Sequence, residues 1–95
     1  MEVIEIKGVK ARVAKTFFER ARGLIGTKDL ADDEGMLILK CNAIHTFFMT
    51  MTIDATFLDK NDNIVKVVKN IRPWRMLVWG GFKAFKVLET KSKIA

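Results

Sequence analysis

Hydrophobic and polar residues alternate along the start of the chain, and this period of two predicts a pair of strands. Over residues 3–7 apolar side chains stand opposite Glu5, and the alternation resumes over residues 9–14 after Gly8. Successive side chains of a strand point to opposite faces, so this pattern is typical of a strand with one buried face. Because only Gly8 interrupts the two runs, we predict a hairpin over residues 3–14.

The pattern then changes to one typical of a short helix. Thr16 is followed three residues later by Glu19, the spacing of a capping box, in which each side chain accepts a hydrogen bond from the other's main-chain N–H. Apolar residues recur at helical spacing at Phe17, Ala21 and Leu24. Gly23 and Gly26 tolerate the left-handed conformation that ends many helices, so we expect the helix to stop there.

The rest of the chain is rich in short strand-like runs. After a polar loop over residues 27–35, strands are predicted at 36–39, 44–49, 55–58, 64–68 and 85–88. A turn at 59–63, rich in Asp and Asn, predicts a second hairpin. Pro73 marks an edge or an irregular connection, because proline donates no ladder hydrogen bond. We therefore expect a single domain over residues 1–95 that is mainly β, with an antiparallel barrel-like or sandwich-like fold and one short helix in its N-terminal half.

Composition narrows the class of protein. The hydrophobic content is 49%, but no apolar run reaches the ~18 residues that span a bilayer. The charged start of the chain is unlike a signal peptide, so a cytoplasmic location and no membrane association are expected. One cysteine excludes an internal disulfide. The scarcity of labile amides and the 29% charged residues are typical of a heat-adapted source.

The net charge of +6 indicates which kinds of binding partner the protein could attract. Basic side chains attract nucleic acid or acidic surfaces. These residues are spread through the chain rather than gathered in a block, so we interpret most of them as a solubilising surface. Nucleic acid remains an alternative that we do not favour, and we expect a monomer or a weak dimer.

Several segments resemble the domain-of-unknown-function 192 family. The matching motifs occur in order along nearly the whole chain: RARGLIG at 20–26, EGML at 34–37, HTFFM at 45–49, IDATFLD at 53–59, RPWR at 72–75 and VLE at 87–89. The resemblance implies a compact, mostly β domain found in bacteria and archaea, in a family without an established activity. The chain departs from the pattern at 50–52 and in its last five residues, where members continue into a glycine-containing segment. This departure leaves open whether a closing strand completes the barrel.

Cys41, His45 and Met49 suggest a metal site, because soft ligands at a spacing of four suit Cu(I) or zinc. On a strand, however, residues four apart lie about 13 Å from one another. A single ion ~2.0–2.3 Å from each ligand cannot bridge that distance. We therefore predict no metal site and no cofactor, and interpret these residues as part of a packed core or barrel interior.

A second hypothesis is a small hydrolase or metal-assisted enzyme centred on His45 and Asp54. Cys41 or Thr46 would attack, His45 would act as the base and Asp54 would orient it. Neighbours such as His45 and Thr46 point to opposite faces of a strand, so we favour a protein that is not an enzyme. Asp54 is then either a solvent-facing residue or a buried acid that accepts main-chain N–H groups.

The hypothesis we favour uses the segment around Pro73. Arginines interleaved with large rings bind phosphates or carboxylates and stack on bases or sugars. The alternative is that the two tryptophans cap the open end of a barrel while the arginines extend into water. We predict a non-enzymatic binding module for an anionic or sugar-like ligand, with a site formed by Arg72, Trp74, Arg75 and Trp79. A further alternative is an interaction domain that pairs through an exposed strand edge.

Overall fold

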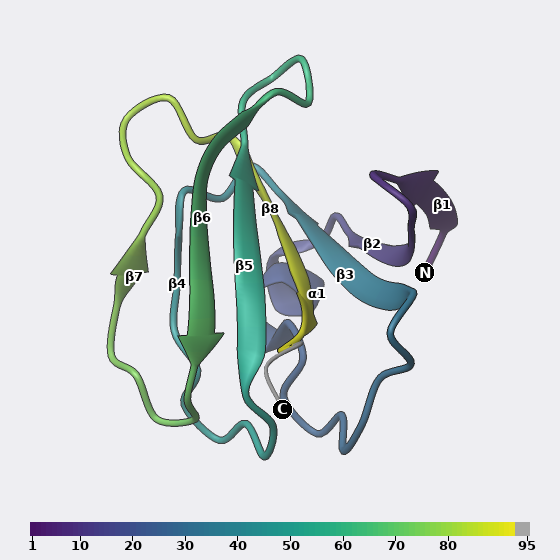
Figure 1. Cartoon of the computed structure of the whole chain (residues 1–95), viewed down its shortest axis with the longest axis vertical. Coiled ribbons are helices and arrows are strands. Elements are labelled where there is room, and N and C mark those ends of the chain that lie inside the picture. Colours follow the sequence, from purple (N-terminus) through teal and green to yellow (C-terminus); the bar gives the residue numbers. More distant parts are fainter. Residues whose placement is uncertain (93–95) are drawn as a thin grey trace.

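The computed structural model describes residues 1–92, which form one mixed six-stranded sheet, a two-stranded sheet and a short helix (Figure 1). The elements in chain order are β1 (Val3–Ile6), β2 (Val9–Ala14), α1 (Phe17–Arg22), β3 (Glu34–Leu39), β4 (Ala43–Ile44), β5 (Ile53–Leu58), β6 (Ile64–Ile71), β7 (Val78–Trp79) and β8 (Lys86–Lys91). The large sheet has the order β1-β2-β3-β8-β5-β6, and β4 pairs with β7. The prediction of a mainly β fold with one short helix is confirmed.

The first hairpin is confirmed, with β1 and β2 antiparallel and Ile6 opposite Val9. Lys7 and Gly8 form its turn, and both have positive φ angles, of 52° and 77°. Tight hairpin turns require this left-handed geometry because its twist matches that of the strands.

The helix is also confirmed. Thr16 accepts a hydrogen bond from the Glu19 N–H at 3.1 Å, and the Glu19 carboxylate accepts from the Thr16 N–H at 3.1 Å, which completes the capping box. The helix ends at Gly23, whose φ is 51°. The segment through α1 joins β2 to β3, and these two strands are parallel. The sequence predicts antiparallel pairing throughout, so this crossover is a feature found only in the structure.

The second hairpin is confirmed as well. The Asp59 carboxylate accepts from the N–H groups of Asn61 and Asn63, and Asp62 has a φ of 65°. The returning strand β6 runs three residues further than predicted, to Ile71. Strand β8 also extends past its predicted end, and it lies between β3 and β5 in the middle of the sheet.

The prediction of a strand over residues 44–49 is wrong. Only Ala43–Ile44 is a strand, and the chain then turns irregularly, with Phe48 at a φ of 63°. The main-chain N–H and carbonyl of Thr46 form hydrogen bonds with residues of the 72–75 turn instead of with a neighbouring strand. Threonine and aromatic residues favour strands on average, but these tertiary hydrogen bonds override that preference.

The core lies on both faces of the large sheet. On one face fully buried side chains such as Phe57 and Met36 form a cluster with Leu24, from the turn after α1, and with residues of β4 and β7. On the other face a smaller cluster contains Leu37, Leu58 and Leu88. Strands β1 and β6 end the sheet without pairing to each other, so the described strands do not close into a barrel. The sequence left open whether a closing strand follows at the end of the chain, and residues 93–95 lie outside the described residues. Within residues 1–92 no helix is long and apolar enough to cross a membrane.

Candidate functional site

The 72–75 turn is anchored to the domain by a single buried threonine. The Thr46 hydroxyl donates to the Arg72 carbonyl at 2.6 Å and accepts from the Arg75 N–H at 2.8 Å. The Thr46 N–H donates to the Arg75 carbonyl at 3.0 Å, and its own carbonyl accepts from the Trp74 N–H at 2.8 Å. Thr46 itself is fully buried, so these bonds tie the exposed turn to the interior of the domain. Its role is to fix the turn, and this accounts for the side chain without nucleophilic chemistry.

Beside this turn lies a group of three rings, which we call the aromatic platform: the exposed Phe48 and Trp74 and the half-buried Phe47. The Trp74 ring centroid lies 4.8 Å from that of Phe48 and 6.1 Å from that of Phe47. Trp74 is 60% exposed and Phe48 is 66% exposed. The flanking Arg72 and Arg75 are exposed residues too. The turn therefore holds three of the four predicted ligand-binding residues together: Arg72, Trp74 and Arg75.

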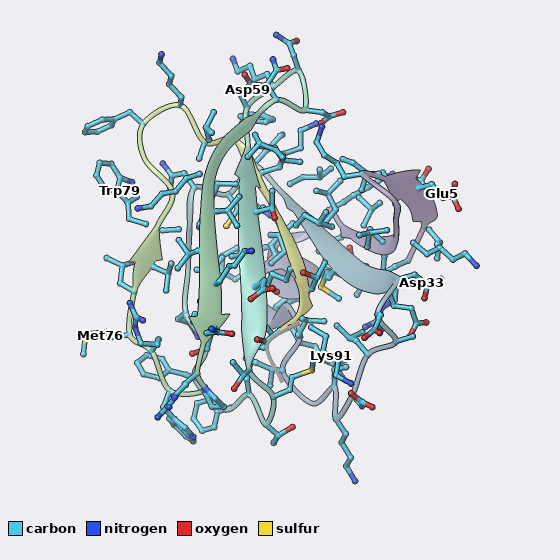
Figure 2. All side chains as sticks on the ribbon, viewed as in Figure 1. Glu5, Asp33, Asp59, Met76, Trp79 and Lys91 are labelled. Atoms are coloured by element: carbon cyan, nitrogen blue, oxygen red, sulfur yellow. The ribbon has the colours of Figure 1, made fainter. Side chains whose placement is uncertain are left out.

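The fourth predicted residue, Trp79, belongs to a different aromatic pair. Its ring contacts Phe82 edge-on, with centroids 4.8 Å apart, and its carbonyl accepts a hydrogen bond from Lys66 at 2.9 Å. Figure 2 shows Trp79 and Met76 separated along the outer edge of the molecule, on the segment that contains β7. No ring pair joins Trp74 to Trp79 among the residues that the structure describes.

His45 and Asp54 lie in different places. Asp54 is buried on the face of β5 opposite the main core, where its carboxylate accepts from the Asn70 N–H at 2.9 Å. This is the buried acid accepting a main-chain N–H that the sequence offered as one alternative. His45 is half-buried on the helix side of the sheet, and its Nδ1 accepts from the Phe47 N–H at 3.1 Å. The arrangement does not bring together His45 and Asp54, on which the alternative hypothesis of a hydrolase depended.

Cys41, His45 and Met49 all line one cavity, which we call the helix pocket. The chain leaves the strand conformation after Ile44, so the assumption of a 13 Å spacing along a strand is wrong. Even so, no group of three or more His, Cys, Asp or Glu side chains within residues 1–92 is arranged to hold a metal ion. The Cys41 thiol donates to the Ala43 carbonyl at 3.0 Å, and burial raises its pKa. A protonated, hydrogen-bonded thiol is a weak nucleophile.

Glu89 was not among the site residues predicted from the sequence, yet it is a charged residue buried within the large sheet. It lies on β8 between Met36 of β3 and Ala55 of β5, and it is only 2% exposed. Its Oε1 has no hydrogen-bond partner among the described residues, and burial raises its pKa to about 8. The carboxyl group reaches the helix pocket beside Gly23, where a Cβ added to that glycine would lie 3.3 Å from Oε1. A glutamate in an otherwise apolar run, in VLE at 87–89, was the available sign.

The alternative of an interaction domain depends on an exposed strand at an edge of the sheet. Strands β1 and β6 form the two ends of the large sheet, and β6 is the longer, with bulges in its pairing to β5. Lysines and bulges on an edge strand discourage pairing with other chains. Lys66 and Lys69 lie on β6. Pairing through an edge stays a prediction.

Comparison with known proteins agrees with the resemblance drawn from the sequence. The model of the domain-of-unknown-function 192 family, described as an uncharacterised ACR, matches residues 2–95. A UPF0127 protein of Thermococcus sibiricus is 36% identical over 85 residues, which cover 85% of this chain and 54% of that protein. A UPF0127 protein of Pyrococcus horikoshii is 36% identical over 72 residues, which cover 73% of this chain and 62% of that protein. The chain thus matches little more than half the length of these relatives.

Two solved structures share the fold. A protein of unknown function from Novosphingobium aromaticivorans superposes with a TM-score of 0.82 at 21% identity, covering 90% of this chain and 64% of that one. A putative transcription regulator from Sinorhizobium meliloti gives a TM-score of 0.82 at 19% identity, covering 88% of this chain and 69% of that one. At this identity the similarity establishes the fold alone.

Proposed function

The chain belongs to the domain-of-unknown-function 192 family, and we propose that it is a non-enzymatic binding module for an anionic or sugar-like ligand, which stacks on the aromatic platform. The observation that supports this function is the anchoring of the 72–75 turn by Thr46. Four hydrogen bonds to this buried threonine hold the turn that carries Trp74, a residue that is 60% exposed.

The main-chain conformation of the aromatic platform costs free energy of folding. Trp74 and Phe48 have φ angles of 69° and 63°, in the left-handed region that residues with side chains rarely occupy. Such conformations cost about 1–3 kcal/mol each and persist where the surrounding structure imposes them. Exposed large rings also forgo the stabilisation that burial would supply. Strained main chain that displays rings instead of burying them is typical of a recognition surface.

The chemistry of the platform suits the proposed ligand. The flat faces of Trp74 and Phe48 offer stacking surfaces for a sugar ring or a base. Arg72 and Arg75 carry planar guanidinium groups that pair with carboxylate or phosphate through two parallel hydrogen bonds. The net charge of +6 adds a general attraction for anions.

A fluorescence titration tests this function. The variant Trp79→Phe makes Trp74 the sole tryptophan, so its emission reports on the platform alone. The probes are a tetrasaccharide containing uronic acids, a neutral tetrasaccharide and a short single-stranded oligonucleotide. We expect the acidic tetrasaccharide to change the emission of Trp74, and the effect to weaken at high salt because exposed charges are screened.

Variants separate specific recognition from bulk charge. Replacing Trp74 by Ala in the wild-type background removes a stacking surface worth about 1–3 kcal/mol, a loss of roughly 5- to 150-fold in affinity measured by calorimetry. Arg72→Ala/Arg75→Ala should abolish binding of the acidic tetrasaccharide. The matched control, Lys10→Ala/Lys28→Ala, removes the same charge from exposed positions on β2 and the 27–33 loop and should bind normally.

Three outcomes contradict the proposal. One is no emission change with any probe, and another is an equal loss of affinity in the two double variants. The third is binding of the oligonucleotide alone, which would replace the sugar-like ligand by nucleic acid.

A further inference from the structure

The helix pocket is a second place where this domain can hold a molecule, separate from the aromatic platform. It has a volume of about 250 Å³, comparable to about eight water molecules at ~30 Å³ each. Residues of α1 and of the turn after it form one side, β8 contributes Glu89, and the segment after β3 contributes Cys41, His45 and Met49. A space of this size accepts a small metabolite.

The pocket contains a carboxyl group that the protein itself does not use. Glu89 is almost completely buried, makes no ion pair, and leaves Oε1 without a hydrogen-bond partner among residues 1–92. Buried polar atoms are normally hydrogen-bonded, and an exception calls for an explanation. Gly23 leaves the space beside Oε1 open, because any side chain at that position would crowd this atom.

The neighbouring polar groups are donors. The Arg20 Nη1 donates to the Lys40 carbonyl at 3.2 Å, while its Nε is buried and has no partner within the described chain. His45 uses Nδ1 to accept from Phe47, so in the neutral ring Nε2 carries the proton. Burial keeps the pKa of Glu89 at about 8, so near pH 7 about nine-tenths of this group is a neutral acid with an O–H to donate. The Cys41 thiol is already bonded to Ala43.

The remaining walls are apolar. Leu24, Ile38 and Met49 all line the pocket and belong to the buried core. From this combination we propose that the helix pocket binds a small organic carboxylate, with its charged end at Arg20 and the neutral acid of Glu89, and its hydrocarbon part against Leu24, Ile38 and Met49.

Other ligand types fit these groups less well. A cation would meet the positive guanidinium of Arg20 and would require Glu89 to ionise in a buried site, which is costly. A neutral amide would leave the charge of Arg20 without a counterion. A carboxylate supplies acceptor oxygens for all three donors and forms the planar pair that a guanidinium prefers.

The pH dependence of binding follows from the groups around Glu89. The flanking residues of β3 and β5, Met36 and Ala55, carry no charge. The titratable or charged groups that line the same pocket are Arg20, Arg22, Cys41 and His45. As the pH rises through about 8, Glu89 loses its donor proton and becomes an anion that repels a bound carboxylate. Affinity should therefore fall above that pH.

Titration of the isotope-labelled protein followed by NMR tests the inference. The probes are butyrate, its neutral counterpart butyramide, and butylamine. We expect butyrate to bind at least tenfold more tightly than either counterpart, with shifts centred on Arg20, Gly23 and Glu89. Butyrate at saturation should also raise the pKa of the Glu89 carboxyl, observed by ¹³C NMR, because a bound carboxylate favours the protonated acid. A purely structural Glu89 would show no such change.

Variants complete the test. Arg20→Gln should weaken butyrate binding tenfold or more, and Arg20→Lys should weaken it less, which guards against a folding defect in the first variant. Glu89→Gln keeps a neutral donor, so it should bind butyrate within about threefold of wild type at pH 7 and lose the decline above pH 8. Lys28→Ala, at an exposed position of the 27–33 loop that does not line the helix pocket, should leave butyrate binding unchanged. Equal binding of butyrate and butyramide, or full binding in folded Arg20→Gln, would overturn the proposal.

Discussion

Glu89→Gln should make the stability of this protein less sensitive to pH. In the folded protein the pKa of Glu89 is about 8, whereas an ordinary glutamate has a value of 4.5. Below pH 4.5 the side chain is protonated in both the folded and the unfolded chain, so it carries no ionisation cost. As the pH rises, the unfolded chain releases this proton readily while the buried group retains it. Wild-type stability from this residue is therefore lost progressively between about pH 4.5 and pH 8.

The size of the effect follows from the two pKa values. Each pH unit between them corresponds to about 1.4 kcal/mol, so the full difference amounts to roughly 4–5 kcal/mol. This is a substantial fraction of the 5–15 kcal/mol that stabilises a typical domain. Glutamine has nearly the same shape and does not ionise. The variant should therefore gain stability relative to wild type by about this amount between pH 4 and pH 8.5.

Urea unfolding followed by circular dichroism at several pH values measures the difference directly. Comparing variant with wild type at each pH cancels the contributions of all other groups. Glu2→Gln provides a control in which the pH dependence of the stability difference should have the opposite sign. A hydrogen bond and ion pair with Lys15 lower the pKa of Glu2, so wild type should be the more stable protein at neutral pH, and that advantage should vanish as the pH falls.

Parallel stability curves for wild type and Glu89→Gln would refute this reasoning. Such curves would mean that Glu89 ionises as easily in the folded protein as in the unfolded chain, and the proposed neutral acid in the helix pocket would lose its basis. A difference that grows toward acid pH would refute it equally.

Three further results are expected. Thr46→Val keeps the shape but removes the hydroxyl that bridges the 72–75 turn, and urea unfolding should show a loss of about 1–3 kcal/mol because two partly buried main-chain groups lose their partner. Lys7→Asn, with a φ of 52° at that position, should stabilise the first hairpin by about 0.5–1 kcal/mol in the same assay, and no gain would contradict the turn geometry. The Cys41 thiol, with its pKa raised by burial, should react with a disulfide reagent at pH 7.5 about tenfold or more slowly than free cysteine, and a rate equal to that of cysteine would contradict its burial.

The sequence predicted correctly those elements whose stabilising contacts join residues close together in the chain. The hairpin before Ala14, the capping box at Thr16 and the turn at 59–63 each depend on residues within a few positions of one another. Such elements are readable because their hydrogen bonds close over short stretches of chain. The strand predicted over 44–49 failed for the opposite reason, since the main-chain partners of Thr46 lie far along the chain, in the 72–75 turn.

The candidate sites were likewise predicted from the sequence only where their residues are neighbours in the chain. Sequence identified Arg72, Trp74 and Arg75 as neighbours, and the structure added that Thr46 anchors them and that Trp79 lies apart. Only the structure separated His45, which lines the helix pocket, from Asp54, which lies on the opposite face of the large sheet. The VLE motif at 87–89 places a glutamate in an apolar run, but only the structure shows that it is buried, because its burial depends on α1, β3 and β5 together.

The sequence by itself determined that this is a single mainly β unit of the domain-of-unknown-function 192 family, with its hairpins and its one helix. Those features follow from periodicity, turn residues and motifs that are local or ordered along the chain. Tertiary structure alone decided the parallel crossover through α1, the exposure of the aromatic platform and the helix pocket around Glu89. Burial and desolvation are properties of assembled elements, so the pKa of a carboxyl group and the accessibility of a ring emerge only when the elements pack.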